Sequence, residues 1–324
     1  MISGSPKAFG QKAGGFERPL QRPRDDDEHS RWQSANRAWW ESTPMCYDWR
    51  VALNARPGSA AYFEEIDRRF IAAADGFLPG RDLPFDAVIP FAQLRDKDVL
   101  EIGVGQGTHA QLLAPRCKSF TGIDLTGAAV EMVASRFRLF KLPGTILQMD
   151  AEQMAFADNS FDYVWSWGVI HHSADTQRVL SEIHRVLRPG GQCTVMVYHR
   201  SWFNYYVSGL LRWLMLAPWR KRTSLHQAGQ SGTDGAIARY YKPNEWRAAT
   251  QHLFVLNSLR VCGMKSDIVL LPYGGLKNLV MRMVPDAGAR FLTRRLRMGS
   301  FLVATMSKPM PNLTAAAAIA RPAN

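Results

Sequence analysis

A regular alternation of strand-like and helix-like segments from about residue 97 to residue 198 constrains the fold most strongly. Short runs of β-branched and aromatic residues predict strands, and apolar residues at helical spacing predict helices. The expected strands are 99–102, 119–123, 145–149, 161–165 and 193–198, and the expected helices are 108–113, 128–137 and 176–187. Such an alternation predicts an α/β fold, a mostly parallel sheet with helices on both faces.

After residue 200 this rhythm ends. Residues 202–219 are aromatic and apolar, and the basic run 220–222 follows them. Two further strands are expected at 254–259 and 300–306, with a basic helical segment at 274–297 between them.

Charge and cysteine usage restrict the setting of the protein. The net charge is +12, and residues 201–324 hold 17 lysines and arginines against four acidic residues. This asymmetry predicts an anionic partner, which could be a nucleic acid, a phosphorylated substrate or an acidic membrane surface. The four cysteines have no metal-binding spacing, and neither a secretory signal nor a membrane-spanning run is visible. We therefore expect reduced thiols, no metal, and a cytoplasmic location with peripheral membrane contact as a further option.

A glycine-rich turn follows the first expected strand. Gly103, Gly105 and Gly107 let the backbone approach a ligand closely, and a helix N-terminus comes directly after them. The register of a dinucleotide fingerprint is absent, because position 108 is threonine.

Acidic residues lie at the ends of successive expected strands. Asp124 follows the second strand, where a carboxylate can bind both hydroxyls of a ribose. Asp150 follows the third strand, where it can accept a hydrogen bond from an adenine amino group. Together with the glycine turn they predict a ligand across the carboxyl edge of the sheet.

These residues resemble the class I S-adenosylmethionine (SAM)-dependent methyltransferases, especially the ubiquinone- and menaquinone-type subgroup. The similar segments are 99–107 (VLEIGVGQG), 122–125 (GIDL), 150–152 (DAE), 156–162 (FADNSFD), 166–172 (SWGVIHH) and 185–191 (RVLRPGG). Residues 39–49 and 63–70 resemble an aromatic N-terminal cap of uncharacterised bacterial members.

The resemblance implies a Rossmann-like sheet of seven mostly parallel strands, with the last strand antiparallel. It also implies SAM as the methyl donor, without a metal. The implied cofactor contacts are Glu101, Gly103, Gly105, Gly107, Asp124, Leu125, Asp150, Ala151 and Trp167.

The chain is then expected to divide into six parts. These are a disordered N-terminus (1–30), a helical N-terminal cap (31–90), a SAM-binding core (91–200), an aromatic and basic insertion forming a substrate lid (201–250), the last core strands with a basic helical insertion (251–308), and a flexible tail (309–324).

Methyl transfer needs a base when the acceptor must lose a proton. The candidates for this role are His171, His172, Tyr198 and His199, and the candidate substrate-binding residues are Trp40, Tyr47, Arg239 and Tyr240. For each single histidine, helix capping or packing is the competing interpretation.

The favoured hypothesis is methylation of oxygen or carbon on a small, apolar acceptor that is quinone-, lipid- or natural-product-like. The alternatives are an RNA methyltransferase, motivated by the basic C-terminal part, and a non-catalytic SAM-binding protein. RNA ranks lower because no RNA-binding module is visible, so a nucleic-acid partner is not expected. The sequence leaves the oligomeric state open.

Overall fold

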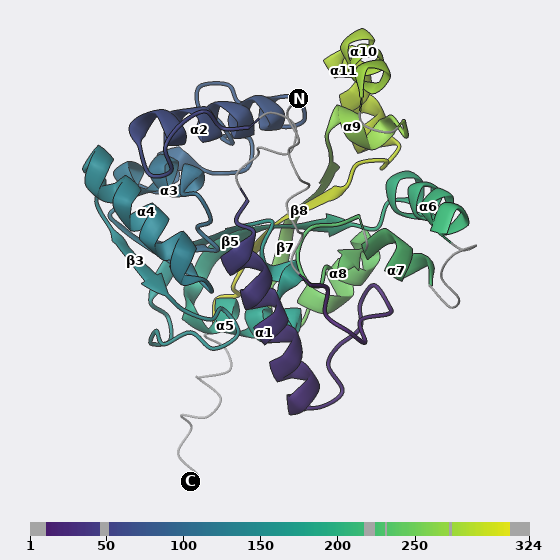
Figure 1. Cartoon of the computed structure of the whole chain (residues 1–324). Helices are drawn as coiled ribbons and strands as arrows, with labels where there is room; N and C mark the ends of the chain where they lie inside the picture. Colours follow the sequence, from purple (N-terminus) through teal and green to yellow (C-terminus); the bar gives the residue numbers. More distant parts are fainter. Residues whose placement is uncertain (1–10, 46–51, 217–223, 231, 272–273, 312–324) are drawn as a thin grey trace.

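The computed structural model describes residues 11–45, 52–216, 224–230, 232–271 and 274–311. An eight-stranded sheet runs through the centre of the molecule (Figure 1). Its strands are β1 (Asp98–Ile102), β2 (Ser119–Asp124), β3 (Thr145–Gln148), β4 (Phe161–Trp167), β5 (Leu187–His199), β6 (Tyr240–Tyr241), β7 (Val255–Cys262) and β8 (Phe301–Ser307). The strand order is β3-β2-β1-β4-β5-β8-β7, and β6 pairs with the end of β5.

The strand directions confirm the predicted mostly parallel sheet. β1 to β5 pair in parallel, whereas β8 is antiparallel to both of its neighbours. The sequence did not indicate β6, whose two residues pair only with Tyr198 and His199. The chain order reverses between β1 and β4, which is the position where open α/β sheets form a crevice.

Helices cover both faces of the sheet, and further helices surround its carboxyl edge (Figure 1). The α-helices are α1 (Asp26–Ser42), α2 (Ala60–Asp75), α3 (Thr108–Leu113), α4 (Gly127–Phe140), α5 (Thr176–Val186), α6 (Ser208–Leu216), α7 (Leu225–Gln230), α8 (Pro243–Thr250), α9 (Lys265–Ile268), α10 (Gly275–Met283) and α11 (Asp286–Arg290). The short 3-10 helices are η1 (Phe91–Gln93), η2 (Ala114–Arg116) and η3 (Ile170–His172), and the π-helices are η4 (Trp202–Val207) and η5 (Phe291–Arg295).

Alternation along β1 divides the core between the two faces. Val99 packs with residues of α2, α3 and α4, and Leu100 packs with residues of α5 and α8. Successive side chains of a strand point to opposite faces, so one short strand joins both apolar layers.

The predicted helix 176–187 is confirmed as α5. Its apolar positions Val179, Leu180 and Ile183 are completely buried. The Asp175 carboxylate accepts the Gln177 N–H at 2.9 Å and caps the first turn. The helix ends at Val186, and the extended segment that follows belongs to β5.

The predicted disorder of residues 1–30 is wrong for residues 11–30, while residues 1–10 lie outside the described part. Phe16 is buried against Trp32, with ring centroids 5.3 Å apart. The Ala13 N–H donates to the Ala236 carbonyl at 3.1 Å. The acidic run that suggested disorder begins α1, because Asp25 accepts the Glu28 N–H at 2.7 Å. Acidic side chains are favourable at a helix N-terminus.

Two other predictions fall at the edge of the described residues. Most of the expected tail, 312–324, lies outside them. No helix in the described parts of the chain combines the length and the apolar character needed to cross a bilayer.

Replacing Ile183 with alanine should lower the free energy of unfolding by about 2–5 kcal/mol, because the fully buried side chain leaves a cavity between α5 and the sheet. Ser181→Ala, at an exposed position of the same helix, is the control and should change stability by less than about 0.5 kcal/mol. Urea unfolding followed by circular dichroism measures both; equal stabilities would contradict the assigned packing.

Candidate functional site

A cavity of about 1690 Å³ lies at the carboxyl ends of β1, β2, β4 and β5. Its wall also includes residues of α1, α2, η4, α6 and the α9–α11 segment. A pocket for one small ligand usually measures roughly 300–1000 Å³. The cavity therefore has room for two ligands side by side.

The glycine turn after β1 forms one end of this cavity. Gly103, Gly105 and Gly107 have φ angles of 80°, 50° and 81°, which favour glycine. A Cβ on Gly103 would lie 2.2 Å from Cγ2 of Val169, whereas a Cβ on Gly105 would meet no atom within 4 Å. The turn is thus packed against Val169 at Gly103, whereas no protein atom covers it at Gly105, which borders the cavity.

Asp124 at the end of β2 borders the cavity beside the glycine turn. Oδ2 accepts the Gly105 N–H at 3.1 Å, and Oδ1 accepts the N–H and the hydroxyl of Thr126 at 3.0 and 2.8 Å. Burial raises the pKa of Asp124, and these hydrogen bonds oppose the rise. A carboxylate has about four acceptor positions, so hydroxyl groups of a ligand can still bind. The neighbouring Leu125 also lines the cavity.

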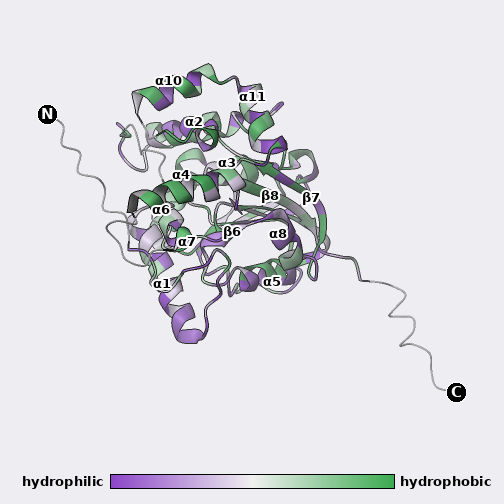
Figure 2. Cartoon of the chain, turned by 90° about the vertical axis from the view of Figure 1, so that its right-hand side faces the viewer, coloured by the Kyte–Doolittle hydropathy of each residue, from purple (hydrophilic) through white to green (hydrophobic). Residues whose placement is uncertain are grey.

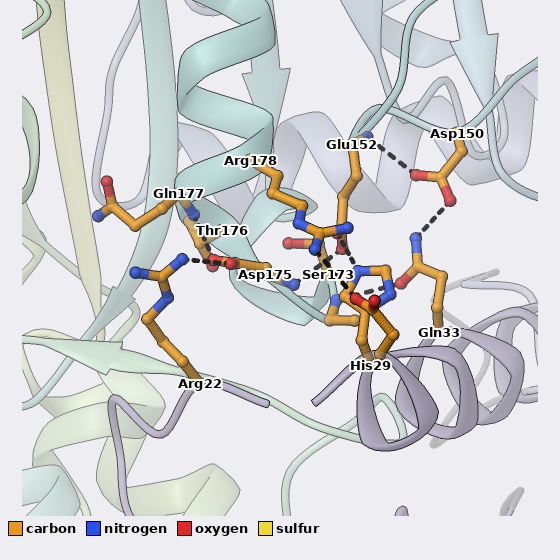
Figure 3. A network of polar contacts seen from close by, with 12 residues as sticks. Arg22, His29, Gln33, Asp150, Glu152, Ser173, Asp175, Thr176, Gln177 and Arg178 are labelled. Atoms are coloured by element: carbon orange, nitrogen blue, oxygen red, sulfur yellow. Dashed lines mark hydrogen bonds and ion pairs between the residues drawn. The ribbon is translucent and has the colours of Figure 1, made fainter. Parts of the chain in front are cut away.

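Asp150 and Ala151 line the cavity next to Asp124. The Asp150 carboxylate accepts the Glu152 N–H at 2.9 Å and the Gln33 side-chain amide at 2.8 Å. His29 lies 2.6 Å from Glu152, from Nε2 to Oε2. Figure 3 shows His29 and Gln33 of α1 pointing together at Asp150 and Glu152.

The N-terminal segment is tied to α5 in the same network (Figure 3). The Ala174 N–H donates to Oε1 of Gln33 at 3.1 Å, and the Asp175 N–H donates to Oε1 of Glu152 at 2.8 Å. Arg22 donates to Asp175 at 2.5 Å. Helix α1 is therefore fixed against both loops that border the cavity on this side.

Glu101 does not line the cavity, although the resemblance implied that it touches the cofactor. It is 1% exposed, with Oε1 3.9 Å from Nδ1 of His109. Burial raises the pKa of Glu101 well above its usual value, and the nearby Asp124 adds to the rise. The side chain points to the α3 and α4 face, behind the glycine turn.

Trp167, a predicted cofactor contact, lies at the end of β4 and lines the cavity. Its ring stacks on Trp165 at 5.4 Å with an interplanar angle of 9°, and it meets the edge of Phe85 at 5.2 Å. These contacts hold the Trp167 ring as a flat apolar part of the cavity wall.

The adjacent His171 and His172 have different surroundings. His171 is completely buried outside the cavity wall, and burial lowers its pKa well below the usual value. His172 lines the cavity and donates from Nδ1 to the Ile237 carbonyl at 2.7 Å. This bond leaves Nε2 of the neutral ring unprotonated, and Nε2 has no hydrogen-bond partner among the described residues.

Other predicted residues gather around His172. The hydroxyl of Tyr198 donates to Asp234 at 2.6 Å, and both residues line the cavity. Tyr240 lines it as well, and its hydroxyl pairs with Thr233. The Trp40 ring approaches that of His172 edge-on at 5.1 Å.

His199, Arg239 and Tyr47 complete the predicted set. His199 borders the cavity, but its Nδ1 donates to the Gly299 carbonyl at 2.7 Å. Arg239 is 2% exposed and outside the cavity wall, so the structure does not place it where it was expected to bind substrate. Its guanidinium donates to the carbonyls of Gln21, Ser173 and Ala174 and joins the N-terminal segment to the core. Tyr47 lies outside the described residues.

Lys12 is a cavity residue that the sequence did not indicate. Nζ donates to the carbonyls of Thr233 and Gly235, the latter at 2.7 Å, and lies 4.5 Å from the Trp39 ring centroid. Burial lowers the pKa of Lys12 to about 8, and the charge of Asp234 opposes the shift. Local composition did not indicate that Lys12 lines the cavity or that Gln33 binds Asp150.

Comparison with known proteins identifies the central region. Residues 100–195 match the methyltransferase domain family. A phthiotriol/phenolphthiotriol dimycocerosates methyltransferase from Mycobacterium tuberculosis is 40% identical over 101 residues, 30% of this chain and 36% of the relative. A ubiquinone biosynthesis O-methyltransferase from Pseudomonas aeruginosa is 33% identical over 156 residues, 46% of this chain and 66% of the relative. The chain thus spans 36% of the length of the mycobacterial relative and 66% of that from Pseudomonas.

A solved SAM-dependent methyltransferase from Methanosarcina mazei is 20% identical, with a TM-score of 0.47, over 67% of this chain and 94% of that chain. The matched family region runs from β1 into β5 and includes the glycine turn and the ends of β2 and β4. Through this domain the chain belongs to the class I SAM-dependent methyltransferase family.

Proposed function

We propose that the protein transfers a methyl group from SAM to an oxygen, or to a carbon, of a small apolar acceptor. The observation that carries this proposal is one continuous cavity that is bordered by the glycine turn, by Asp124 and by His172. A cavity with room for two ligands can hold the methyl donor and the methyl acceptor together. The relative from Pseudomonas aeruginosa is an O-methyltransferase of ubiquinone biosynthesis, which supports oxygen as the acceptor atom.

The residues at the glycine-turn end of the cavity suit an adenosyl group. The bare face of Gly105 would accept close approach, and the spare acceptor positions of Asp124 would bind ribose hydroxyls. Asp150 and Ala151 would hold the adenine, and the Trp167 ring would flank the reacting end. Bound SAM supplies an electrophilic methyl group on a sulfonium sulfur.

The chain's main task in methyl transfer is to align the acceptor with the donor and to exclude water. His172 would accept the proton that a hydroxyl acceptor loses, since its Nδ1 bond to Ile237 keeps Nε2 free. Burial lowers the pKa of His172, and the charge of Asp234 opposes this shift, so Asp234 would stabilise the imidazolium that results. Tyr198 would hold Asp234 in position through its hydroxyl.

The walls near His172 favour an apolar, flat acceptor. Trp40, Tyr198, Tyr205, Tyr240 and Phe301 line this part of the cavity. Aromatic faces bind apolar rings by offset or edge-to-face packing. A quinone-like or lipid-like compound therefore fits better than a strongly charged one.

The activity itself can be tested by incubating the protein with methyl-labelled SAM and either a bacterial lipid extract or total RNA. We expect label in the organic phase and none on RNA. Label on RNA would support the RNA alternative. Binding of SAM by calorimetry without transfer to either pool would support the non-catalytic alternative.

Replacing Asp124 with asparagine should weaken binding of S-adenosylhomocysteine by about 10- to 100-fold, because charge-assisted hydrogen bonds to the ribose are lost. Glu131→Gln is the control, since Glu131 is exposed on the following helix α4. Isothermal titration calorimetry measures both affinities. An unchanged affinity in the Asp124 variant would contradict the proposed ribose site.

The pH profile of kcat/KM should report His172. Burial lowers its pKa below the usual value of about 6.5, so the neutral base persists to lower pH. We expect a plateau from neutral pH down to about 6.5 and a fall only in more acidic solution.

His172→Asn can still donate to the Ile237 carbonyl but lacks Nε2. It should lower kcat about 10²- to 10⁴-fold and remove the acid limb of the profile. His184→Asn on α5, a histidine outside the cavity, is the matched control. A His172 variant with the wild-type rate and profile would exclude this residue as the base.

A further inference from the structure

Exposed apolar side chains gather on one side of the molecule. Twelve of the fourteen large apolar side chains that are exposed in the described residues lie between residues 202 and 296. Figure 2 shows α6 and α10, both of which carry hydrophobic residues along their length. Large exposed apolar patches on a folded chain mark interaction surfaces.

The first part of this surface runs along η4 and α6. Trp202, Tyr206, Leu210 and Leu214 follow one another at intervals of four residues, and all four are exposed. Residues four apart lie on the same side of a helix. They form an exposed apolar stripe along η4 and α6.

The second part lies on α10. Leu276, Leu279 and Met283 are 63%, 56% and 74% exposed, at intervals of three and four residues. Phe291 and Leu296, on and just after η5, are exposed nearby in the chain. Three large apolar side chains on one face of a nine-residue helix are therefore left in water.

A direct contact joins the two parts. The indole N–H of Trp202 donates to the Leu296 carbonyl at 2.9 Å. We call the exposed apolar residues of η4, α6, α10 and η5 together, with Leu296, the α6–α10 surface. In Figure 1 its helices project from the same side of the sheet.

Basic side chains accompany this surface. Arg282, Arg295 and Arg297 are exposed within or beside its second part. Asp286 is the only acidic residue from 274 to 297, and it pairs with Lys265 at 2.6 Å. The surface thus combines apolar and uncompensated positive groups, which complements an anionic, partly apolar partner.

The same helices form part of the cavity wall. Ser208 and Gly209 of α6 and Met281 of α10 line the cavity, while the α6–α10 surface is turned outward. A compound carried by a partner bound to this surface would therefore be close to the cavity.

We propose that the α6–α10 surface binds an anionic lipid bilayer and lies in its interface. Leucine, methionine and tryptophan beside arginine are typical of interfacial helices, in which apolar side chains enter the acyl boundary and basic groups meet lipid phosphates. Single-stranded RNA would instead favour stacked aromatic residues in a basic groove. If the proposed methyl transfer is correct, the acceptor is an amphiphile that enters from the bilayer. This statement about the acceptor rests on the proposed function, whereas bilayer binding does not.

Sedimentation with vesicles tests the surface without SAM, so its result does not depend on the methyltransferase activity. The full chain should bind vesicles of phosphatidylcholine with 30% phosphatidylglycerol at least tenfold more tightly than phosphatidylcholine alone, and less tightly as salt rises. Equal or undetectable binding to the two vesicle types would overturn the proposal.

Two double variants test the apolar and the basic contributions to bilayer binding separately. Leu279→Glu with Met283→Glu should abolish binding, and Arg282→Glu with Arg295→Glu should weaken it at least tenfold, since each basic group near the surface contributes about fivefold. Leu139→Glu and Arg138→Glu, at exposed positions of α4, are the matched controls and should bind as the wild type does. Circular dichroism verifies that all variants are folded.

Other occupants of the surface give distinct outcomes. A dimer in sedimentation equilibrium that the Leu279 and Met283 variant disrupts, without vesicle binding, would assign the surface to a second copy. Mixed-sequence RNA that binds in place of vesicles and is lost in the arginine variant would assign it to nucleic acid. Either result overturns the bilayer proposal.

Discussion

The parallel pairing of β1 with β2 on one side and β4 on the other is the constraint on which the site depends. This register brings Ile102 beside Ile123 and Ser166, so three loops leave the sheet at one edge. The glycine turn, Asp124 and Trp167 therefore border one cavity although they are far apart in sequence. Every further contact of the site is built around this edge.

The N-terminal segment completes the cavity from outside the matched family region. Lys12, Gln33 and Trp40 border it, and hydrogen bonds to Asp150, Ala174 and Ala236 fix the segment to the core. Arg239, far along the chain, also fixes this segment by donating to the Gln21 carbonyl. The glycine-turn end of the cavity thus comes from the matched family region, and much of the remaining wall comes from segments outside that region.

Helices α6 and α10 have two distinct roles in this arrangement. Their inner residues line the cavity, and their outer residues leave apolar side chains in water. A globular chain gains stability by burying such side chains, so their exposure on these two helices supports the proposed partner. The aromatic interior and the apolar exterior agree with an acceptor of low polarity.

Local sequence determined the sheet, the helix α5 and the positions of the glycine turn, Asp124 and Trp167, because hydrophobic period and turn residues act over short distances. Tertiary structure alone decided that Glu101 lies behind the turn, that Arg239 is structural, and that His172 rather than His171 lines the cavity. It also decided that residues 11–30 are ordered, since Phe16 and Lys12 gain their partners from Trp32 and residues 233–235. Composition describes a segment by itself, whereas burial and hydrogen bonding depend on which distant residues the fold brings against it.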